Sequence, residues 1–146
     1  MITLPKKLFH AIEAVLSLSY RATAEPLSGK ELCEKLGLPP RYLEAMMQQL
    51  VRVGILRGVR GPSGGYLLAK SPERISLTDI CLALRDEQEL PESHTELGQK
   101  LLLDVCEGLQ EHCLKYLDTI TLASLAEEAS RKHIKREGAH FMDFTI

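Results

Sequence analysis

The stretch VRGPSGGYLL at residues 59–68 places one cation, Arg60, at the base of a glycine-rich turn. Glycine adopts positive φ and carries no Cβ, so such a loop turns tightly and lets its backbone approach another surface. Loops that hold nucleotide phosphates follow the pattern GxxxxGKS or GxxxxGKT and lead into a helix. Here the glycines lead into the strand-forming residues YLLA instead, which predicts a β-hairpin. The guanidinium of Arg60 is suited to a phosphate, and a purely structural hairpin is the alternative interpretation.

Four cysteines are the other residues with reactive side chains, and no two of them form a CxxC pair. Scattered thiols are typical of a reducing compartment, so we expect free thiols and a cytoplasmic protein. Cys106 and Cys113 fall within one predicted helix, about 10 Å apart along its axis. A disulfide needs Cα atoms within about 7 Å, so these two thiols could pair only between two chains. They are candidate redox residues, and packing in an apolar face is the simpler interpretation.

The sequence offers no arrangement typical of an enzyme or of a metal site. It contains no Ser/His/Asp set, no pair of catalytic carboxylates and no histidine cluster with the spacing of metal ligands. It also has no run of about 18 apolar residues, so we predict no membrane span. Glu13 interrupts the apolar N-terminal stretch, which argues against a signal peptide. We therefore predict a protein that is not an enzyme and binds no metal.

Two short helices predicted upstream of the hairpin are joined by only a few residues. Ser28 and Glu31 match the capping box SxxE, and Gly37 is a typical helix stop. The second helix is predicted to begin near Pro40 and end near Gly54. Its apolar residues recur on one face, which consists of Leu43, Met46, Met47, Leu50 and Val53. This spacing predicts a helix-turn-helix, in which the second helix reads DNA.

A further helix is predicted at residues 6–20, before this pair of helices, and the hairpin follows the pair. Helix, short helix, helix and hairpin is the element order of a winged helix. We assign residues 1–85 to a winged helix-turn-helix DNA-binding domain. In this arrangement Arg60 would contact a DNA phosphate or the minor groove.

Charge divides the chain into two unlike halves. Residues 1–75 carry 11 Lys and Arg against 6 Asp and Glu, a net charge of +5, whereas residues 76–146 carry 7 against 14, a net charge of −7. The overall net charge of −2 hides this division. A basic first half suits a nucleic-acid partner, although an uneven spread of solvated charges would look the same.

The second half contains one long apolar helix pattern. Ser93 and Glu96 match a second capping box, and the pattern runs to about Leu117. A helix this apolar needs a partner, and a second copy related by twofold symmetry is the simplest one. The fold class that we predict is therefore mainly α: a winged helix-turn-helix domain with a two-stranded wing and a long C-terminal dimerisation helix. The predicted dimer interface contains Leu101, Val105, Leu109, Cys113, Tyr116 and Leu117.

The segments that flank this helix are polar. RDEQELPESH at residues 85–94 is acidic and rich in turn-forming residues, so we expect an exposed loop. Thr121 is a candidate cap for a short helix through Glu128, and we place the dimerisation helix and this short helix within residues 86–130. In the tail at residues 131–146, the basic stretch RKHIKREG is either solvated or an extra phosphate contact. The apolar end, AHFMDFTI, is expected to dock on the protein.

The sequence resembles the Rrf2 family of bacterial winged helix-turn-helix regulators, which includes IscR-, NsrR-, RirA- and CymR-type proteins. The resemblance covers about residues 7–85, and its most specific motifs are RYLE, VRGPSGGYLLA and ISLTDI. It implies a homodimer that binds a pseudo-palindromic operator in double-stranded DNA, with recognition helices in adjacent major grooves and wings at the minor groove. By position it assigns DNA contacts to Arg41, Tyr42, Glu44, Ala45, Gln48, Arg52, Arg60, Ser63 and Gly64.

Several of these assignments have a simpler alternative. Tyr42 is equally suited to packing, Glu44 to a solvated helix surface, and Arg52 and Arg57 to phosphates or solvent. Ala45 stands where some relatives have glutamine. Alanine can touch a thymine methyl group but cannot form the two hydrogen bonds that glutamine makes to adenine. The operator of those relatives therefore cannot be transferred to this chain.

Many members of the family hold an iron–sulfur cluster through three closely spaced cysteines in the loop before the dimerisation helix. The corresponding loop here, residues 86–99, contains no cysteine, and its carboxylates suit harder cations. We therefore predict no cofactor bound in that way. A minority of the family uses residues of the first helix, which leaves His10 and Glu13, with Cys106 approaching them in the dimer, as an alternative ligand set.

These features together predict a sequence-specific DNA-binding transcriptional regulator that acts as a homodimer and a repressor. The alternative is a winged-helix module that binds another protein. A DNA-binding wing should face the same way as Arg41 and Arg52 and form one positive surface with them. An interaction module has no such requirement.

Overall fold

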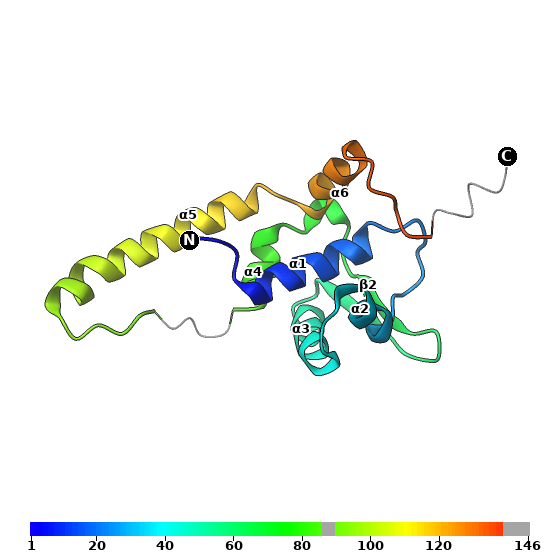
Figure 1. Ribbon diagram of the computed structural model, residues 1–146, viewed down its shortest axis with the longest axis horizontal. Helices are drawn as coiled ribbons and strands as arrows, with labels where there is room; N and C mark the ends of the chain where they lie inside the picture. The colour runs from blue at the N-terminus through cyan, green and yellow to red at the C-terminus, as the bar shows by residue number, and fades with distance from the viewer. Residues whose placement is uncertain (86–89, 139–146) are drawn as a thin grey trace.

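The computed structural model describes residues 1–85 and 90–138, and it shows a winged helix from which one long helix projects (Figure 1). The predicted fold class is confirmed, because the described residues are mainly helical and contain a two-stranded antiparallel sheet. In chain order the elements are α1 (Lys6–Ser19), α2 (Gly29–Leu36), α3 (Pro40–Arg52), β1 (Leu56–Val59), β2 (Gly65–Leu68), η1 (Pro72–Arg74), α4 (Leu77–Ala83), the π-helical turn η2 (Gly98–Leu102), α5 (Leu103–Asp118) and α6 (Leu122–Arg131).

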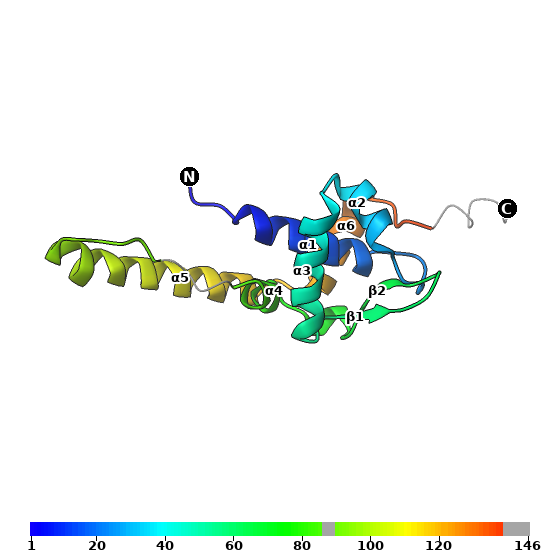
Figure 2. The ribbon, with the colours of Figure 1, turned by 90° about the horizontal axis from the view of Figure 1, so that it is seen from below.

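The core lies where α1, α3 and α4 pack together. Small and apolar residues recur at helical spacing on the buried face of α1, which consists of Leu8, Ala11, Ile12, Ala14 and Val15. α3 crosses α1 steeply (Figure 2) and buries Leu43, Met46, Met47 and Leu50. α4 adds Leu77 and Ile80. This packing holds α3 in place and leaves its opposite face to solvent.

The predicted helix-turn-helix is confirmed in its local geometry. The Ser28 hydroxyl accepts a hydrogen bond from the backbone N–H of Glu31 at 3.1 Å, which caps α2. Gly37 ends α2 with a φ of 65°, a left-handed conformation that glycine adopts without strain. α3 then begins at Pro40, whose missing N–H is no loss in the first turn of a helix. The short connection fixes α2 and α3 close together.

β1 and β2 form the predicted hairpin, with Leu56 opposite Leu68. The hairpin also pairs with the residue that precedes the cap of α2. The Tyr66 N–H donates to the Leu27 carbonyl at 2.9 Å, and the Leu27 N–H donates to the Tyr66 carbonyl at 3.2 Å. A Cβ at position 65 would lie 2.3 Å from the Leu27 carbonyl oxygen, so this approach requires Gly65. Glycine therefore seats the wing against the start of the helix-turn-helix.

The long helix begins at Glu96 and continues through η2 and α5 to Asp118. The capping box predicted at Ser93 is wrong, because the cap is Thr95, whose hydroxyl accepts a hydrogen bond from the N–H of Gly98 at 3.0 Å. Both positions carry a hydroxyl, but only Thr95 stands directly before the first helical residue. Within the described ranges, no helix is both long and apolar enough to cross a membrane.

α6 follows as predicted, with its N-terminus capped by Thr121. The helix ends at Arg131, slightly beyond the expected end at Glu128. Part of the acidic loop, residues 86–89, and the apolar end, residues 139–146, lie outside the described residues. The docking expected for that end therefore stays a prediction.

The chain beyond α6 runs back along the winged helix. The Tyr20 hydroxyl donates to the carbonyl of Ile134, and the guanidinium carbon of Arg136 lies 4.4 Å from the centre of the Tyr20 ring. The next residue, Glu137, pairs through its carboxylate with the Lys35 ammonium at 2.6 Å. The basic stretch is exposed, which agrees with both of its interpretations. It also contacts Tyr20 at the end of α1 and Lys35 of α2.

Candidate nucleic-acid interface

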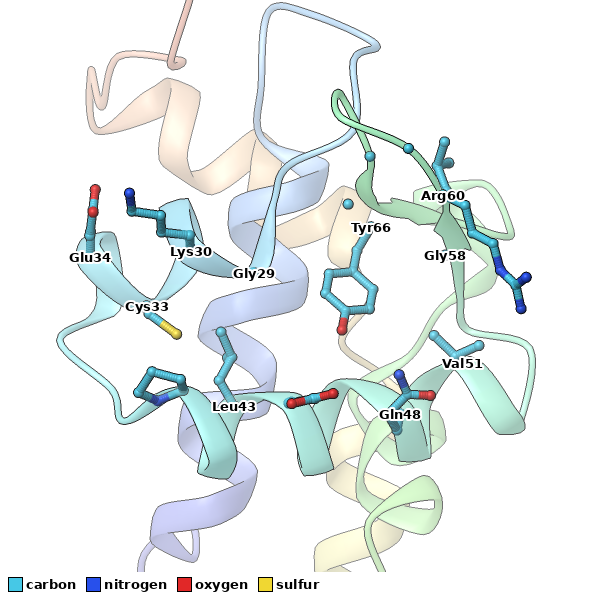
Figure 3. A pocket seen from close by; sticks show the side chains of 16 residues that line it. Gly29, Lys30, Cys33, Glu34, Leu43, Gln48, Val51, Gly58, Arg60 and Tyr66 are labelled. Atoms are coloured by element: carbon cyan, nitrogen blue, oxygen red, sulfur yellow. The ribbon is translucent and has the colours of Figure 1, made fainter.

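A cleft of about 930 Å³ lies between α2, α3 and the hairpin. Figure 3 shows the Tyr66 ring projecting from the hairpin toward α3, which contributes Leu43 and Gln48 to the wall. Lys30 and Cys33 of α2 form the opposite side. The cleft thus joins the predicted recognition helix and the predicted wing in one surface.

The outer face of α3 presents most of the residues predicted to contact DNA. Arg41, Glu44, Ala45, Gln48 and Arg52 are all exposed, because the apolar positions between them are buried in the core. Glu44 and Gln48 line the cleft, and the other three are exposed on α3 beside it. One face of a single helix therefore carries both the predicted base contacts and the predicted phosphate contacts.

Tyr42 belongs to a different environment from these neighbours. It is partly buried, and its hydroxyl lies 3.1 Å from Nδ1 of His10 in α1. The two rings meet edge to face, with centres 5.7 Å apart. Tyr42 therefore ties α3 to α1, which agrees with the packing interpretation of this residue. A contact to DNA could involve only the part of its ring that remains exposed.

The hairpin supplies the other wall of the cleft. Arg60 and Gly64 line it, whereas Ser63 is exposed in the turn and does not. Figure 3 shows the Arg60 side chain on the outer side of the hairpin. A Cβ at position 64 would lie 2.2 Å from the Val59 carbonyl oxygen, and Gly61 has a φ of 110°. Both glycines are needed for this turn, and Arg60 is the cation next to it; Arg57 of β1 is a second exposed cation of the hairpin.

The lining residues that were not predicted from the sequence include Lys30, Cys33, Glu34 and Tyr66. Burial raises the pKa of the Tyr66 phenol, and the Glu44 carboxylate and the Cys33 thiol raise it further. Tyr66 therefore stays neutral and able to donate a hydrogen bond. Lys30 had a usable signal, since it follows the Ser28 cap by two residues and must lie in the first turn of α2.

Charges in the cleft are mixed. Lys30 and Arg60 contribute cations, and Glu34 and Glu44 contribute carboxylates. The single positive surface expected of a DNA-binding wing is therefore interrupted, although further arginines of α3 lie beside it. A carboxylate repels phosphates but can accept a hydrogen bond from the cytosine amino group. Glu44 is consequently a candidate for reading bases rather than for binding the phosphate backbone.

Comparison with known proteins identifies the family to which this fold belongs. The sequence model of the Rrf2 family, described as an iron-dependent transcriptional regulator, matches residues 4–128. The chain belongs to the Rrf2 family. The match extends well beyond the winged helix and includes the long helix and most of α6.

Individual Rrf2 relatives match over most of their length. A Synechocystis sp. protein assigned by its name to the HTH-type transcriptional regulators is 33% identical over 144 residues, which cover 95% of this chain and 98% of the relative. T. potens IscR superposes with a TM-score of 0.72 at 27% identity and 96% coverage of both chains. Staphylococcus aureus CymR in an oxidised form superposes with a TM-score of 0.67 at 30% identity, covering 86% of this chain and 97% of that one.

These relatives are transcriptional regulators and not enzymes. The predictions that this chain is a transcriptional regulator and that it is not an enzyme are therefore confirmed. The protein is accordingly a DNA-binding regulator with a winged helix-turn-helix. The cleft between α3 and the hairpin is the part of this fold that is suited to DNA.

The iron named in the family's description does not fit the loop before the long helix. That loop has no cysteine in its sequence, and thiolates are the usual ligands of iron–sulfur clusters. The four cysteines stand instead in α2, α4 and α5. Across residues 1–85 and 90–138, no three His, Cys, Asp or Glu side chains are grouped so as to hold a metal ion. His10, Glu13 and Cys106 therefore do not form a ligand set within one chain.

Proposed function

We propose that this Rrf2 protein represses transcription by binding a pseudo-palindromic operator as a homodimer. The observation that carries the proposal is that the exposed face of α3 and the wing cation Arg60 converge on one cleft. In a winged helix, α3 would enter the major groove while the wing follows the backbone or the minor groove. A dimer bound across a promoter would exclude RNA polymerase, which is the simplest route to repression.

The contacts divide by their chemistry. The guanidinium groups of Arg41, Arg52 and Arg60 suit phosphates, which set affinity and orientation. Glu44 and Gln48 have side chains that suit base edges, and Ala45 suits the thymine methyl group. Ser63 and the backbone of Gly64 lie where the wing would approach the DNA backbone. Half or more of the hydrogen bonds in such interfaces go to the backbone, so the arginines should dominate affinity.

Support for the dimer comes from the long helix. Its side chains leave a wide apolar face in solvent, with Leu97 70% exposed and Val105 65% exposed. The same face includes Leu101, Leu102, Leu109 and Tyr116. A contiguous apolar surface of this kind is typical of a protein interface. A second copy, related by twofold symmetry, would cover it and place two recognition helices on adjacent half-sites.

One residue of the predicted dimer interface is not available to a partner. Leu117 is only 7% exposed, because it packs into the core of its own chain. Leu101, Val105, Leu109, Cys113 and Tyr116 remain exposed and available to a partner. We also propose that no three-cysteine loop cluster is bound and that the dimer acts in the cytoplasm.

Substitution of the wing cation tests the DNA-binding surface. Loss of one phosphate or groove contact in Arg60→Ala should weaken binding by about 1–3 kcal/mol, which is roughly 5- to 150-fold in Kd. Arg74→Ala is the matched control, since Arg74 is an exposed cation of the same domain in η1, outside the cleft. Mobility shift on genomic fragments selected by the wild-type protein, at two salt concentrations, provides the measurement.

The two outcomes separate the proposal from its alternative. Affinity that falls with salt and with Arg60→Ala, but not with Arg74→Ala, supports DNA binding through the cleft. The mixed charges of the cleft favour the alternative of a protein-interaction module. That alternative is supported if the protein selects no DNA fragment, or if its affinity for DNA changes neither with salt nor with Arg60→Ala.

A further inference from the structure

A second cavity, of about 640 Å³, lies on the other side of the molecule from the wing, between the N-terminal segment, α4 and α5. Its lining is mostly apolar and includes Leu8 and Leu114. Three of the chain's four cysteines line it: Cys81 from α4, and Cys106 and Cys113 from α5. This concentration of thiols has no part in the proposed DNA contacts.

Two hydrogen bonds fix how α4 lies against α5. The backbone N–H of Leu77 donates to the carbonyl of Ile120 at 2.9 Å, so the start of α4 meets the end of α5. One residue later, the Thr78 hydroxyl donates to the carbonyl of Leu114 at 2.5 Å. The two helices therefore run antiparallel. Residues that follow Thr78 in α4 lie beside residues that precede Leu114 in α5.

This register selects one pair of thiols. Cys81 lies about 4.5 Å along α4 from Thr78, and Cys113 about 1.5 Å along α5 from Leu114, so the two differ by about 3 Å along the helix direction. Cys106 lies about 12 Å from Leu114, which leaves it about 7.5 Å further along than Cys81. Disulfides need Cα atoms within about 7 Å, a limit that already includes the sideways separation of two helices. Cys113 is therefore the cysteine of α5 that lies nearest to Cys81 of α4.

We propose that Cys81 and Cys113 form an intramolecular disulfide that links α4 to α5 under oxidising conditions. In the structure both thiols are free, with Cys113 exposed and Cys81 partly buried beside the core. The bond would join the winged helix domain, to which α4 belongs, directly to the long helix.

The chemistry balances with a hydroperoxide as the oxidant. The Cys113 thiolate attacks one peroxide oxygen, the O–O bond breaks, and the leaving oxygen takes a proton to form water or an alcohol. Cys113 is then a sulfenic acid, oxidised by two electrons. The Cys81 thiolate attacks that sulfur, the S–S bond forms, the S–O bond breaks, and hydroxide leaves as water with the proton that Cys81 gave up.

The exposure of the two thiols gives each its role. Cys113 meets the oxidant first because it is exposed within its own chain, and we place this step before the proposed dimer covers it. Burial raises the pKa of the Cys81 thiol, the positive Arg85 lowers it, and Cys113 raises it again. Cys81 is therefore mostly protonated at neutral pH and protected from direct oxidation, and it reacts once a neighbouring sulfenic acid is present.

Oxidation of the full-length reduced protein with hydrogen peroxide tests the proposal. We expect free thiols, counted after denaturation, to fall from four per chain to two. Non-reducing electrophoresis should show a monomer. Peptides cleaved after glutamate, which separates Cys106 from Cys113 at Glu107 and Glu111, should be joined through Cys81 and Cys113. The peptide map uses wild-type protein, so it does not depend on whether any variant folds.

Variants then identify the pair. Cys81→Ala and Cys113→Ala should each abolish the cross-linked peptide, whereas Cys33→Ala and Cys106→Ala should keep it. Circular dichroism before oxidation shows which variants are folded. A covalent dimer that is lost in Cys113→Ala would overturn the proposal in favour of pairing between chains. Joined peptides that contain Cys106, or four thiols unchanged after oxidation, would overturn it as well.

Discussion

The winged helix domain and the long helix place their apolar side chains in opposite ways. In the domain, Leu50 of α3 is fully buried, whereas Leu101 in the long helix is 58% exposed. The domain closes its core with α1, α3 and α4, to which the following helices add Leu117 and Leu122, while the rest of the long helix leaves an apolar face in solvent. This contrast indicates that the long helix, whose apolar side chains lie in solvent, is the part of the chain on which the proposed dimer depends.

The largest expected effect comes from a charge on the exposed face of the long helix. Leu109→Asp would bury an unpaired carboxylate in the proposed dimer, at a cost of several kcal/mol. Because Leu109 is 45% exposed within its own chain, the monomer should remain folded. Sedimentation velocity should show a monomer, and circular dichroism should stay unchanged.

Lys115→Asp is the matched control for this prediction. Lys115 is exposed on the same helix and pairs with Glu111 in an exposed ion pair whose loss costs about 0–1 kcal/mol. It should remain a dimer. A dimeric Leu109→Asp protein would place the interface elsewhere and remove the contrast between the two halves.

A truncation in each half sharpens the comparison at a smaller scale. Made in the monomeric Leu109→Asp background, Leu50→Ala should lower the free energy of unfolding by about 2–5 kcal/mol, because it leaves a cavity in the core. Leu101→Ala in the same background should change it by less than about 0.5 kcal/mol, as is usual at the surface. Urea denaturation measures both, and similar losses for the two variants would mean that the long helix has its own buried contacts.

The smallest effect concerns the start of the long helix. Thr95→Ala should destabilise its first turn by about 1 kcal/mol, since it removes the side chain that caps the Gly98 N–H. Ser93→Ala should have a weaker effect, because the Ser93 hydroxyl makes long hydrogen bonds of 3.4 Å to the N–H and the hydroxyl of Thr95 and caps no N–H of the helix. Amide hydrogen exchange of residues 96–100 distinguishes the two. The opposite ranking would restore the cap that the sequence pattern predicted.

Local patterns predicted what local physics controls. The apolar period of α3, the stop at Gly37 and the glycines of the wing each specify the conformation of a few neighbouring residues, and the structure confirms them. The exception is Val53, which was predicted on the apolar face but is exposed because α3 ends at Arg52. Two hydroxyl residues, Ser93 and Thr95, could each cap the long helix. The SxxE pattern selected Ser93, although the backbone turns into the helix at Thr95.

Contacts between residues far apart in the sequence could not be predicted in the same way. Tyr42 meets His10 across 32 positions, and Tyr66 pairs with Leu27 only because the hairpin folds back on the start of α2. The meeting of Cys81 with α5 likewise depends on how α4 packs. These contacts follow from the tertiary arrangement, for which a single sequence carries no short pattern.

Hydroxyl-radical footprinting on a selected genomic fragment tests the central claim most directly. A dimer held by the long helix and reading DNA through α3 should protect two patches related by a twofold axis, with centres about 10 base pairs or a multiple of that apart. Leu109→Asp should lose both patches together at the protein concentration that saturates the wild type. A single unsymmetrical patch, or protection that survives equally in the monomeric variant, would contradict the account.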